Sequence, residues 1–132
     1  MDWNHFGRGL GGLRRKYGLR QKQVADNTGF SPSYIAALEG GRRPPPSEEA
    51  LKKIIEAIGA SAHEEAQLLR ASKLTDIARV MANYSDAFPG TAAAISLLEV
   101  STEMTAVEVD AFQTLVEGYR FRSLLPMRSE RN

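Results

Sequence analysis

Twenty residues, Gln21 to Gly40, carry the pattern that most restricts how this chain can fold. Two short helices joined by a tight turn pack at a steep angle, so their inner positions accept only certain residue types. Ala25 is small enough for two helix backbones to approach, and Gly29 can adopt the positive φ that the turn needs. Ile35 and Leu38 lie one helical turn apart and are expected to face the core. These spacings together predict a helix-turn-helix.

Cap residues divide the first half of the chain into five expected helices. Ser31 is followed by Pro32 at the helical position where a missing N–H costs nothing, and Ser61 with Glu64 forms a capping box. Gly59 can close a helix in the left-handed conformation. Apolar residues recur at three- and four-residue spacings, so we expect helices at about 6–17, 21–28, 31–39, 47–58 and 61–71. They predict a five-helix domain over residues 1–72.

Residues 73–132 are expected to form a helical dimerisation or interaction region. Leu74, Ile77 and Met81 keep the alternating spacing of a coiled-coil-like seam, residues 83–90 resemble a loop, and a longer helix is expected to begin near Thr105. The last residues, 128–132, are expected to fray. No stretch has the strict alternation of a strand, so the predicted fold class is all-α.

The apolar stripe of the last helix is either intramolecular core or a dimer interface. We favour the interface, because the first five helices should already close their own core and leave the later helices a face to bury. Gly118 argues the other way, since it weakens that helix near its end. The expected interface residues are Leu74, Ile77, Met81, Met104, Val107, Ala111, Leu115 and Tyr119.

Positive charge is concentrated around the predicted helix-turn-helix. The whole chain has a formal net charge of +1, whereas residues 8–43 hold eight Lys and Arg against two acidic residues, a local balance of +6. This stretch is either a footprint for nucleic-acid phosphates or a solvated helical face. Residues 73–132 are acidic, with six Lys and Arg against eight Asp and Glu.

At this point the chain resembles a known family. The stretch LRRKYGLRQKQVADNTGFSPSYIAALEGGRR, followed by LKKIIEAIGAS, is similar to the lambda-repressor-like, or Xre, helix-turn-helix regulators from Leu13 to about Leu69. The resemblance implies five helices, the third of which lies in the major groove of double-stranded DNA, and a two-fold dimer. It implies a phosphate contact for Gln21 and a structural pair formed by Arg14 and Glu39. It also implies that base edges face Ser31, Pro32, Ser33 and Ala37.

The chain departs from the family at two places. Arg20 stands where Ser or Thr usually caps the second helix, so either that cap is absent or the arginine serves a phosphate. The expected recognition surface also lacks the Gln, Asn and Arg side chains that bind bases in a bidentate manner. We therefore expect a larger share of specificity to come either from DNA shape or from Arg42 and Arg43, which would reach phosphates or a minor groove just past the helix. Tyr34 either packs, touches phosphate or reads a base. The expected DNA-binding residues are Arg20, Gln21, Lys22, Ser31, Pro32, Ser33, Tyr34, Ala37, Arg42 and Arg43.

Composition argues against several other classes of protein. The chain has no cysteine, and His5 and His63 lie in different elements without a carboxylate cluster, so we expect no metal and no cofactor. The run GRGLGG at residues 7–12 lies in a helical context and does not predict a phosphate loop, and no serine has a nucleophile-elbow context, so we expect no enzyme. Neither a signal peptide nor a membrane span is evident, which predicts a cytoplasmic, nucleoid-associated protein.

Two hypotheses for function follow from these patterns. The first is a transcriptional regulator, a repressor that binds a two-fold operator as a homodimer through residues 1–72. The second is an antitoxin-type protein, whose C-terminal helices bind and neutralise a protein partner while DNA binding serves autoregulation. The acidic second half and its apolar stripe motivate the second hypothesis.

Overall fold

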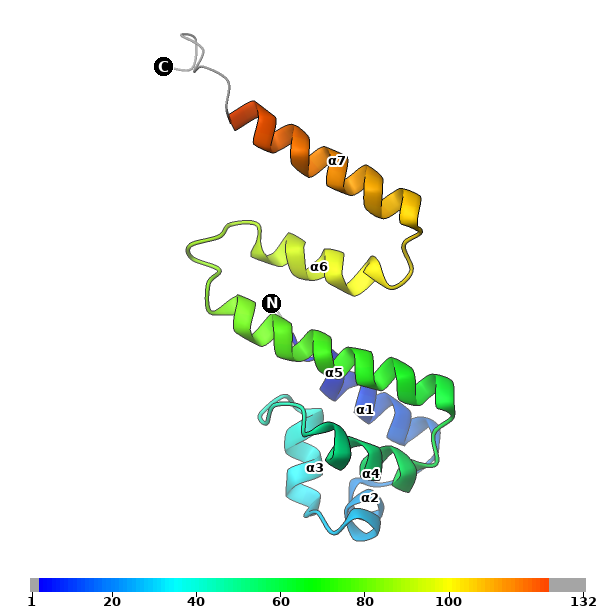
Figure 1. Ribbon diagram of the computed structural model, residues 1–132. Coiled ribbons are helices and arrows are strands. Elements are labelled where there is room, and N and C mark those ends of the chain that lie inside the picture. The colour runs from blue at the N-terminus through cyan, green and yellow to red at the C-terminus, as the bar shows by residue number, and fades with distance from the viewer. Residues whose placement is uncertain (1–2, 124–132) are drawn as a thin grey trace. The chain divides into compact units, whose positions relative to one another are not determined.

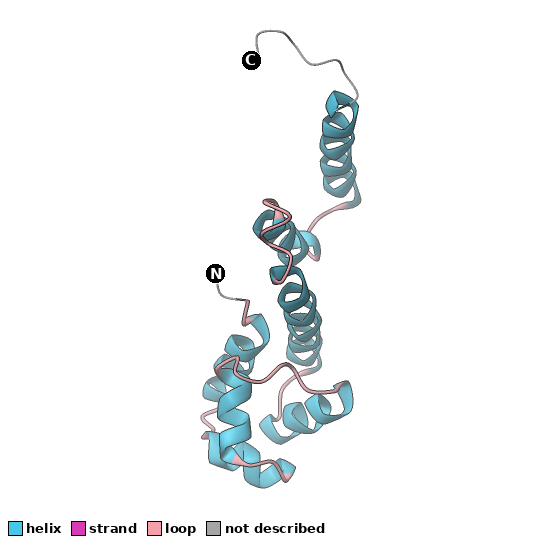
Figure 2. Cartoon of the chain, turned by 90° about the vertical axis from the view of Figure 1, so that its left-hand side faces the viewer, coloured by secondary structure: helices cyan, strands magenta, loops and turns pink. Residues whose placement is uncertain are grey.

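The computed structural model describes residues 3–123, and all regular structure among them is α-helical (Figures 1 and 2). The predicted all-α class is confirmed, while the tail predicted to fray, residues 128–132, lies outside the described residues. None of the described helices combines the length and the apolarity needed to cross a membrane. The helices are α1 (His5–Lys16), α2 (Gln21–Thr28), α3 (Pro32–Glu39), α4 (Glu48–Ile58), α5 (Ala62–Ala82), α6 (Thr91–Ser101) and α7 (Ala106–Ser123).

Local capping chemistry sets most helix boundaries in the first half of the chain. The hydroxyl oxygens of Ser31, Ser47 and Ser61 each accept a hydrogen bond from the backbone N–H three residues further on, at 3.1–3.2 Å. These bonds satisfy N–H groups that have no acceptor within the helix. Gly29 and Gly59 end α2 and α4 in the left-handed conformation, both at φ 81°. The starts and ends of α2 and α4 therefore fall within a residue of the predicted ones.

The five helices α1, α2, α3, α4 and α5 share one apolar core. The helices α2 and α3 pack on each other, α1 packs on α3 and α5, and α4 packs on α2 and α5. In Figure 1, α2 and α3 lie at the bottom of this group, below α1 and α5. The motif residues Ala25, Ile35 and Leu38 are completely buried. The core consists of Phe6, Leu10, Val24, Ala25, Ile35, Leu38, Leu51, Ile54, Ile55, Ile58 and Leu68.

The helix α5 is longer than the sequence predicts. It does not end near residue 71 but runs without interruption for 21 residues to Ala82. Beyond residue 70 its buried side chains are Ser72, Thr75 and Ala78. The predicted seam lies on another face, where Ile77 is 45% exposed. The small side chains on the buried face allow α5 to lie close to α1. This contact, and not apolar periodicity, determines which face of α5 is buried.

The compact units of the chain differ in extent from the predicted regions. The first unit ends at Ile95 and the second begins at Ser96, whereas the predicted boundary after residue 72 falls inside α5. Thr91 and Ile95 at the start of α6 are buried. How DNA binding and assembly are divided between residues 1–72 and 73–132 stays a prediction.

The helix α7 has an uncovered apolar surface. Among residues 106–122 no side chain is fully buried, and only Val116 is half-buried. Of the predicted stripe, Val107 is 78%, Leu115 58% and Tyr119 64% exposed, and Met104 just before the helix is half-buried. The part of the stripe that lies on α7 is therefore not a core within the described residues.

Candidate nucleic-acid interface

The last residue of α3 lies directly against the first turn of α1. Gly7 and Gly11 are buried on the side of α1 that faces α3. A Cβ atom on Gly7 would lie 2.5 Å from the carbonyl oxygen of Glu39, so only glycine permits this approach. Asn4 joins the two helices, because its Nδ2 donates to the Glu39 carbonyl at 2.8 Å and its Oδ1 accepts from the Gly7 N–H at 3.1 Å.

Sequence reasoning missed this role of the glycines. Gly7 and Gly11 belong to the run GRGLGG, whose composition alone resembles a phosphate loop and does not predict a contact with α3. Their four-residue spacing places both on one face of a helix, and it was the available signal for close helix packing. Asn4 carried no such signal, since its main partner is 35 residues away.

Arg14 and Glu39 tie α1 to the end of α3. The Arg14 guanidinium donates Nε–H to Glu39 Oε2 at 2.8 Å and Nη2–H to Oε1 at 2.9 Å, and the two side chains are 13% and 9% exposed. Its Nη1 also donates to the Leu19 carbonyl at 2.8 Å. The hydrogen bonds that Arg14 donates to Glu39 raise the pKa of Arg14, and the negative charge of the carboxylate adds to the effect while burial opposes it. The bidentate pair fixes α3 on α1.

The start of α2 is held by side chains other than the expected cap. A guanidinium has no acceptor, so Arg20 cannot cap the helix. Instead, Gln23 Oε1 accepts from the Arg20 backbone N–H at 2.7 Å. Gln21 Nε2 donates to Glu39 Oε1 at 3.3 Å, which joins α2 to the pair formed with Arg14. A phosphate contact for Arg20 or Gln21 stays a prediction.

The outward side of α3 presents small side chains and side chains that already contact other residues of the protein. Ser31, Pro32 and Ser33 are exposed, and Ala37 is half-buried. The Ser31 and Ser33 hydroxyl oxygens lie 3.1 Å apart and share a hydrogen bond. Tyr34 is half-buried, and its ring packs on Phe30 with centroids 5.2 Å apart and planes tilted by 58°. The packing alternative predicted for Tyr34 is therefore realised at its ring.

Exposed cations stand at both ends of the motif. Arg20 and Lys22 lie at the start of α2, and Arg42 and Arg43 follow α3 directly. The backbone N–H groups of Arg42 and Arg43 both donate to the Ala37 carbonyl, at 2.9 and 3.2 Å, which orders the turn that carries them. The outward side of α3 thus exposes small neutral side chains, and along the chain exposed cations lie at the start of α2 and after α3.

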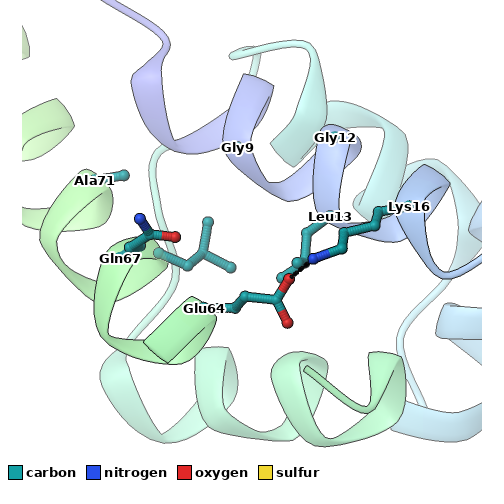
Figure 3. Close-up of a pocket in the computed structure, with 8 residues that line it drawn as sticks. Gly9, Gly12, Leu13, Lys16, Glu64, Gln67 and Ala71 are labelled. Carbon is teal, nitrogen blue, oxygen red and sulfur yellow. Dashed lines mark hydrogen bonds and ion pairs between the residues drawn. The ribbon is translucent and has the colours of Figure 1, made fainter. Parts of the chain in front are cut away.

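A groove between α1 and α5 lies apart from this surface (Figure 3). Its volume is about 320 Å³. At one end Lys16 Nζ lies 2.6 Å from Glu64 Oε2, and the Tyr17 hydroxyl donates to the same carboxylate. These hydrogen bonds, that from Lys16 first, lower the pKa of Glu64 to about 2. The charges in the groove are therefore already paired. It is lined by Gly9, Gly12, Leu13, Lys16, Glu64, Gln67, Leu68 and Ala71.

Comparison with known proteins finds a domain family and a relative that are similar to the first half of the chain. Residues 5–68 match the family model described as a helix-turn-helix domain. A stretch of 49 residues is 43% identical to the uncharacterized HTH-type transcriptional regulator y4dJ of Sinorhizobium fredii, and it covers 37% of this chain and 62% of that relative. No solved structure matches the chain. The matched residues contain α1 to α4, the start of α5 and the whole predicted motif, so this part of the chain is similar to a helix-turn-helix domain.

Proposed function

We propose that the protein is a transcriptional regulator that binds double-stranded DNA with α3 in the major groove. The observation that carries the proposal is α3 itself, whose inner face is buried while its outer face is exposed, with exposed cations at the start of α2 and after α3 along the chain. The major groove admits a helix, and the phosphates that flank it suit cations on either side. The name of the relative as a transcriptional regulator supports the same conclusion.

Phosphate contacts should supply most of the affinity. The exposed cations Arg20, Lys22, Arg42 and Arg43 are long enough to reach backbone oxygens, whereas the outward side of α3 offers serine hydroxyls and the apolar groups of Pro32 and Ala37. Serine accepts or donates to several bases, and apolar groups suit thymine methyls. Specificity therefore depends strongly on DNA shape at sites the protein does not touch.

The regulator should act as a homodimer and a repressor, with the lambda-repressor-like type as the closest model for its docking. Exposed Val107, Leu115 and Tyr119 on α7 give two copies an apolar surface to bury against each other. A two-fold dimer reads two half-sites about one helical turn apart, roughly 34 Å. A repressor needs only to occupy such a site, which requires no further activity of the chain.

A second candidate function uses the same apolar surface differently. In an antitoxin-type protein, the face of α7 would be covered by a protein partner, and DNA binding would regulate the protein's own synthesis. The observation that favours it is the exposure of α7 together with the net negative charge of residues 73–132. Purification from the native host separates the two candidates, because a stoichiometric second protein supports the partner and a symmetric homodimer alone supports the first candidate.

DNA binding is tested by selection from a pool of duplexes with randomised centres, followed by titration of the selected duplex at several salt concentrations. The logarithm of the binding constant should fall linearly with log[salt], with a slope of about −0.9 per phosphate contacted. Arg43→Ala should reduce the slope by about one contact. Arg70→Ala, which removes an exposed arginine of α5, is the matched control and should leave it unchanged. A protein without salt-dependent binding to any duplex would refute the proposal.

Dimer formation is tested by sedimentation of the wild type and of two variants of α7. Leu115→Asp places a charge on the proposed apolar interface and should yield a monomer. Gln113→Asp places the same charge on the opposite side of the helix and should leave the dimer intact. A monomeric wild type, or a dimer that survives Leu115→Asp, would argue against this interface.

A further inference from the structure

The first turn of α1 depends on a residue of α5 for one of its hydrogen bonds. The first N–H groups of a helix have no acceptor within it. The buried N–H of Phe6 donates to Thr75 Oγ1 at 2.9 Å, across 69 residues of sequence. Thr75 is 1% exposed, so water cannot replace this acceptor. The long part of α5 therefore completes the start of α1.

The same turn of α1 holds the end of α3. Asn4 donates to the carbonyl oxygen of Glu39, and Gly7 lies against that oxygen. The C-terminal end of α3 thus rests on a turn of α1 that is itself held by Thr75. Thr75 is thus connected to Glu39 through two hydrogen bonds and one close backbone contact.

One turn further along α5, a second side chain reaches the turn that follows α3. Arg79 Nη1 donates to the carbonyl oxygen of Gly41 at 3.2 Å. Gly41 has φ 76°, and a Cβ atom there would lie 2.9–3.2 Å from the Asn4 side-chain atoms. Arg42 and Arg43 follow Gly41 directly in the sequence. The hydrogen bond from Arg79 therefore holds the backbone immediately before these two arginines.

We propose that Thr75 and Arg79 are positioning residues for DNA binding, which set the end of α3 and the turn carrying Arg42 and Arg43. Both lie beyond residue 68, where the match to the helix-turn-helix model ends. The inference rests on the proposed function for its consequence, because a displaced turn matters only if its arginines meet DNA. The long form of α5 is then part of the DNA-binding machinery.

The spectroscopic test uses the free full-length protein and four variants. In ¹H–¹⁵N spectra, Arg79→Met should shift the amide signals of residues 41–43 and speed their hydrogen exchange, while Arg70→Met, which removes a charge from the same helix, should leave them unchanged. Thr75→Val should shift the signals of residues 6, 7 and 39, and Thr75→Ser, which keeps the hydroxyl acceptor, should restore them. If Thr75→Val fails to fold, Arg79→Met and Thr75→Ser still decide the question.

The binding test uses the duplex selected by the wild type from the randomised pool. Arg79→Met should weaken binding by about three- to tenfold, the loss expected from one hydrogen bond, and Arg70→Met should not. Weaker binding with unchanged signals at residues 41–43 would mean that Arg79 touches DNA itself, and it would overturn the proposal. Equal losses in both variants would overturn it as well. A wild type that binds no duplex would refute the proposed function, while the spectra would still decide whether Arg79 and Thr75 hold the turn.

Discussion

Two glycines of α1 should respond in opposite ways to the same substitution. Replacing a helical glycine by alanine stabilises an unhindered helix by about 1 kcal/mol, because the backbone loses less entropy on folding. A Cβ atom on Gly12 would have no heavy atom within 4 Å, so Gly12→Ala should raise the free energy of unfolding by nearly that amount. At Gly7 the same atom would lie 2.5 Å from the Glu39 carbonyl oxygen and would also overlap the Asn4 side chain.

The cost at Gly7 can be worked from these contacts. Ordinary van der Waals contact begins near 3.4 Å, so the end of α3 would have to move by almost 1 Å. Overpacking of this kind costs about 1–3 kcal/mol. The two Asn4 hydrogen bonds that would be distorted contribute about 1 kcal/mol each. After the gain in helix propensity, Gly7→Ala should lower the free energy of unfolding by about 2–4 kcal/mol.

Urea denaturation followed by circular dichroism measures both variants on one scale. The wild type should lie between the two, with Gly12→Ala above it and Gly7→Ala below it. The comparison is internally controlled, since both changes add one methyl group to one helix. A Gly7→Ala protein as stable as the wild type would refute the close approach of α3 to α1.

The other predictions concern stability and its dependence on pH. Arg14→Met should lower the free energy of unfolding, measured by denaturant titration, by about 3 kcal/mol, because it leaves the carboxylate of Glu39 buried without its cation. The double variant with Glu39→Gln should lose less of that free energy than the two single changes together. The pKa of Glu64 falls from its ordinary 4.5 to about 2 in the folded protein, so its stabilising effect should be complete above pH 4.5 and disappear as the pH falls to about 2. Lys16→Met should reduce that loss in acid unfolding curves. Tyr34→Phe should change the unfolding free energy by less than about 0.5 kcal/mol, since the ring contact is kept.

The sequence predicts the helix boundaries of the first half well because the chemistry that sets them is local. The hydroxyl oxygens of Ser31 and Ser47 each accept a hydrogen bond from the N–H three residues further on. Ser61 and Glu64 each accept a hydrogen bond from the backbone N–H of the other across the same separation. Gly29 adopts the positive φ that the turn needs. Each of these interactions lies within four residues, so reading the chain in order reveals them.

The same reading fails for α5, where a distant contact decides. Apolar periodicity points to a seam through Leu74 and Ile77, but the buried face carries Ser72, Thr75 and Ala78. The burial of Thr75 is tolerated because its hydroxyl accepts a hydrogen bond from the backbone of α1, 69 residues earlier. A polar residue on an apparent surface position gives no sign of such a partner, so hydrophobic pattern alone does not reveal the face that packs on α1. The seam through Leu74 and Ile77 stays a prediction for the dimer interface.

The sequence predicts the proposed DNA-binding surface only in part, because some of its residues also hold the scaffold together. Gln21, which the family resemblance places on phosphate, also bonds Glu39, and Tyr34 packs on Phe30. A substitution at either position changes the scaffold along with any DNA contact, so lost binding there does not by itself assign a contact. The Lys22 side chain is exposed and takes no part in the core, which makes its charge the cleaner probe of phosphate binding. The assignment of the DNA-facing surface should therefore begin from such residues, and the shared ones should be interpreted only with stability measured beside affinity.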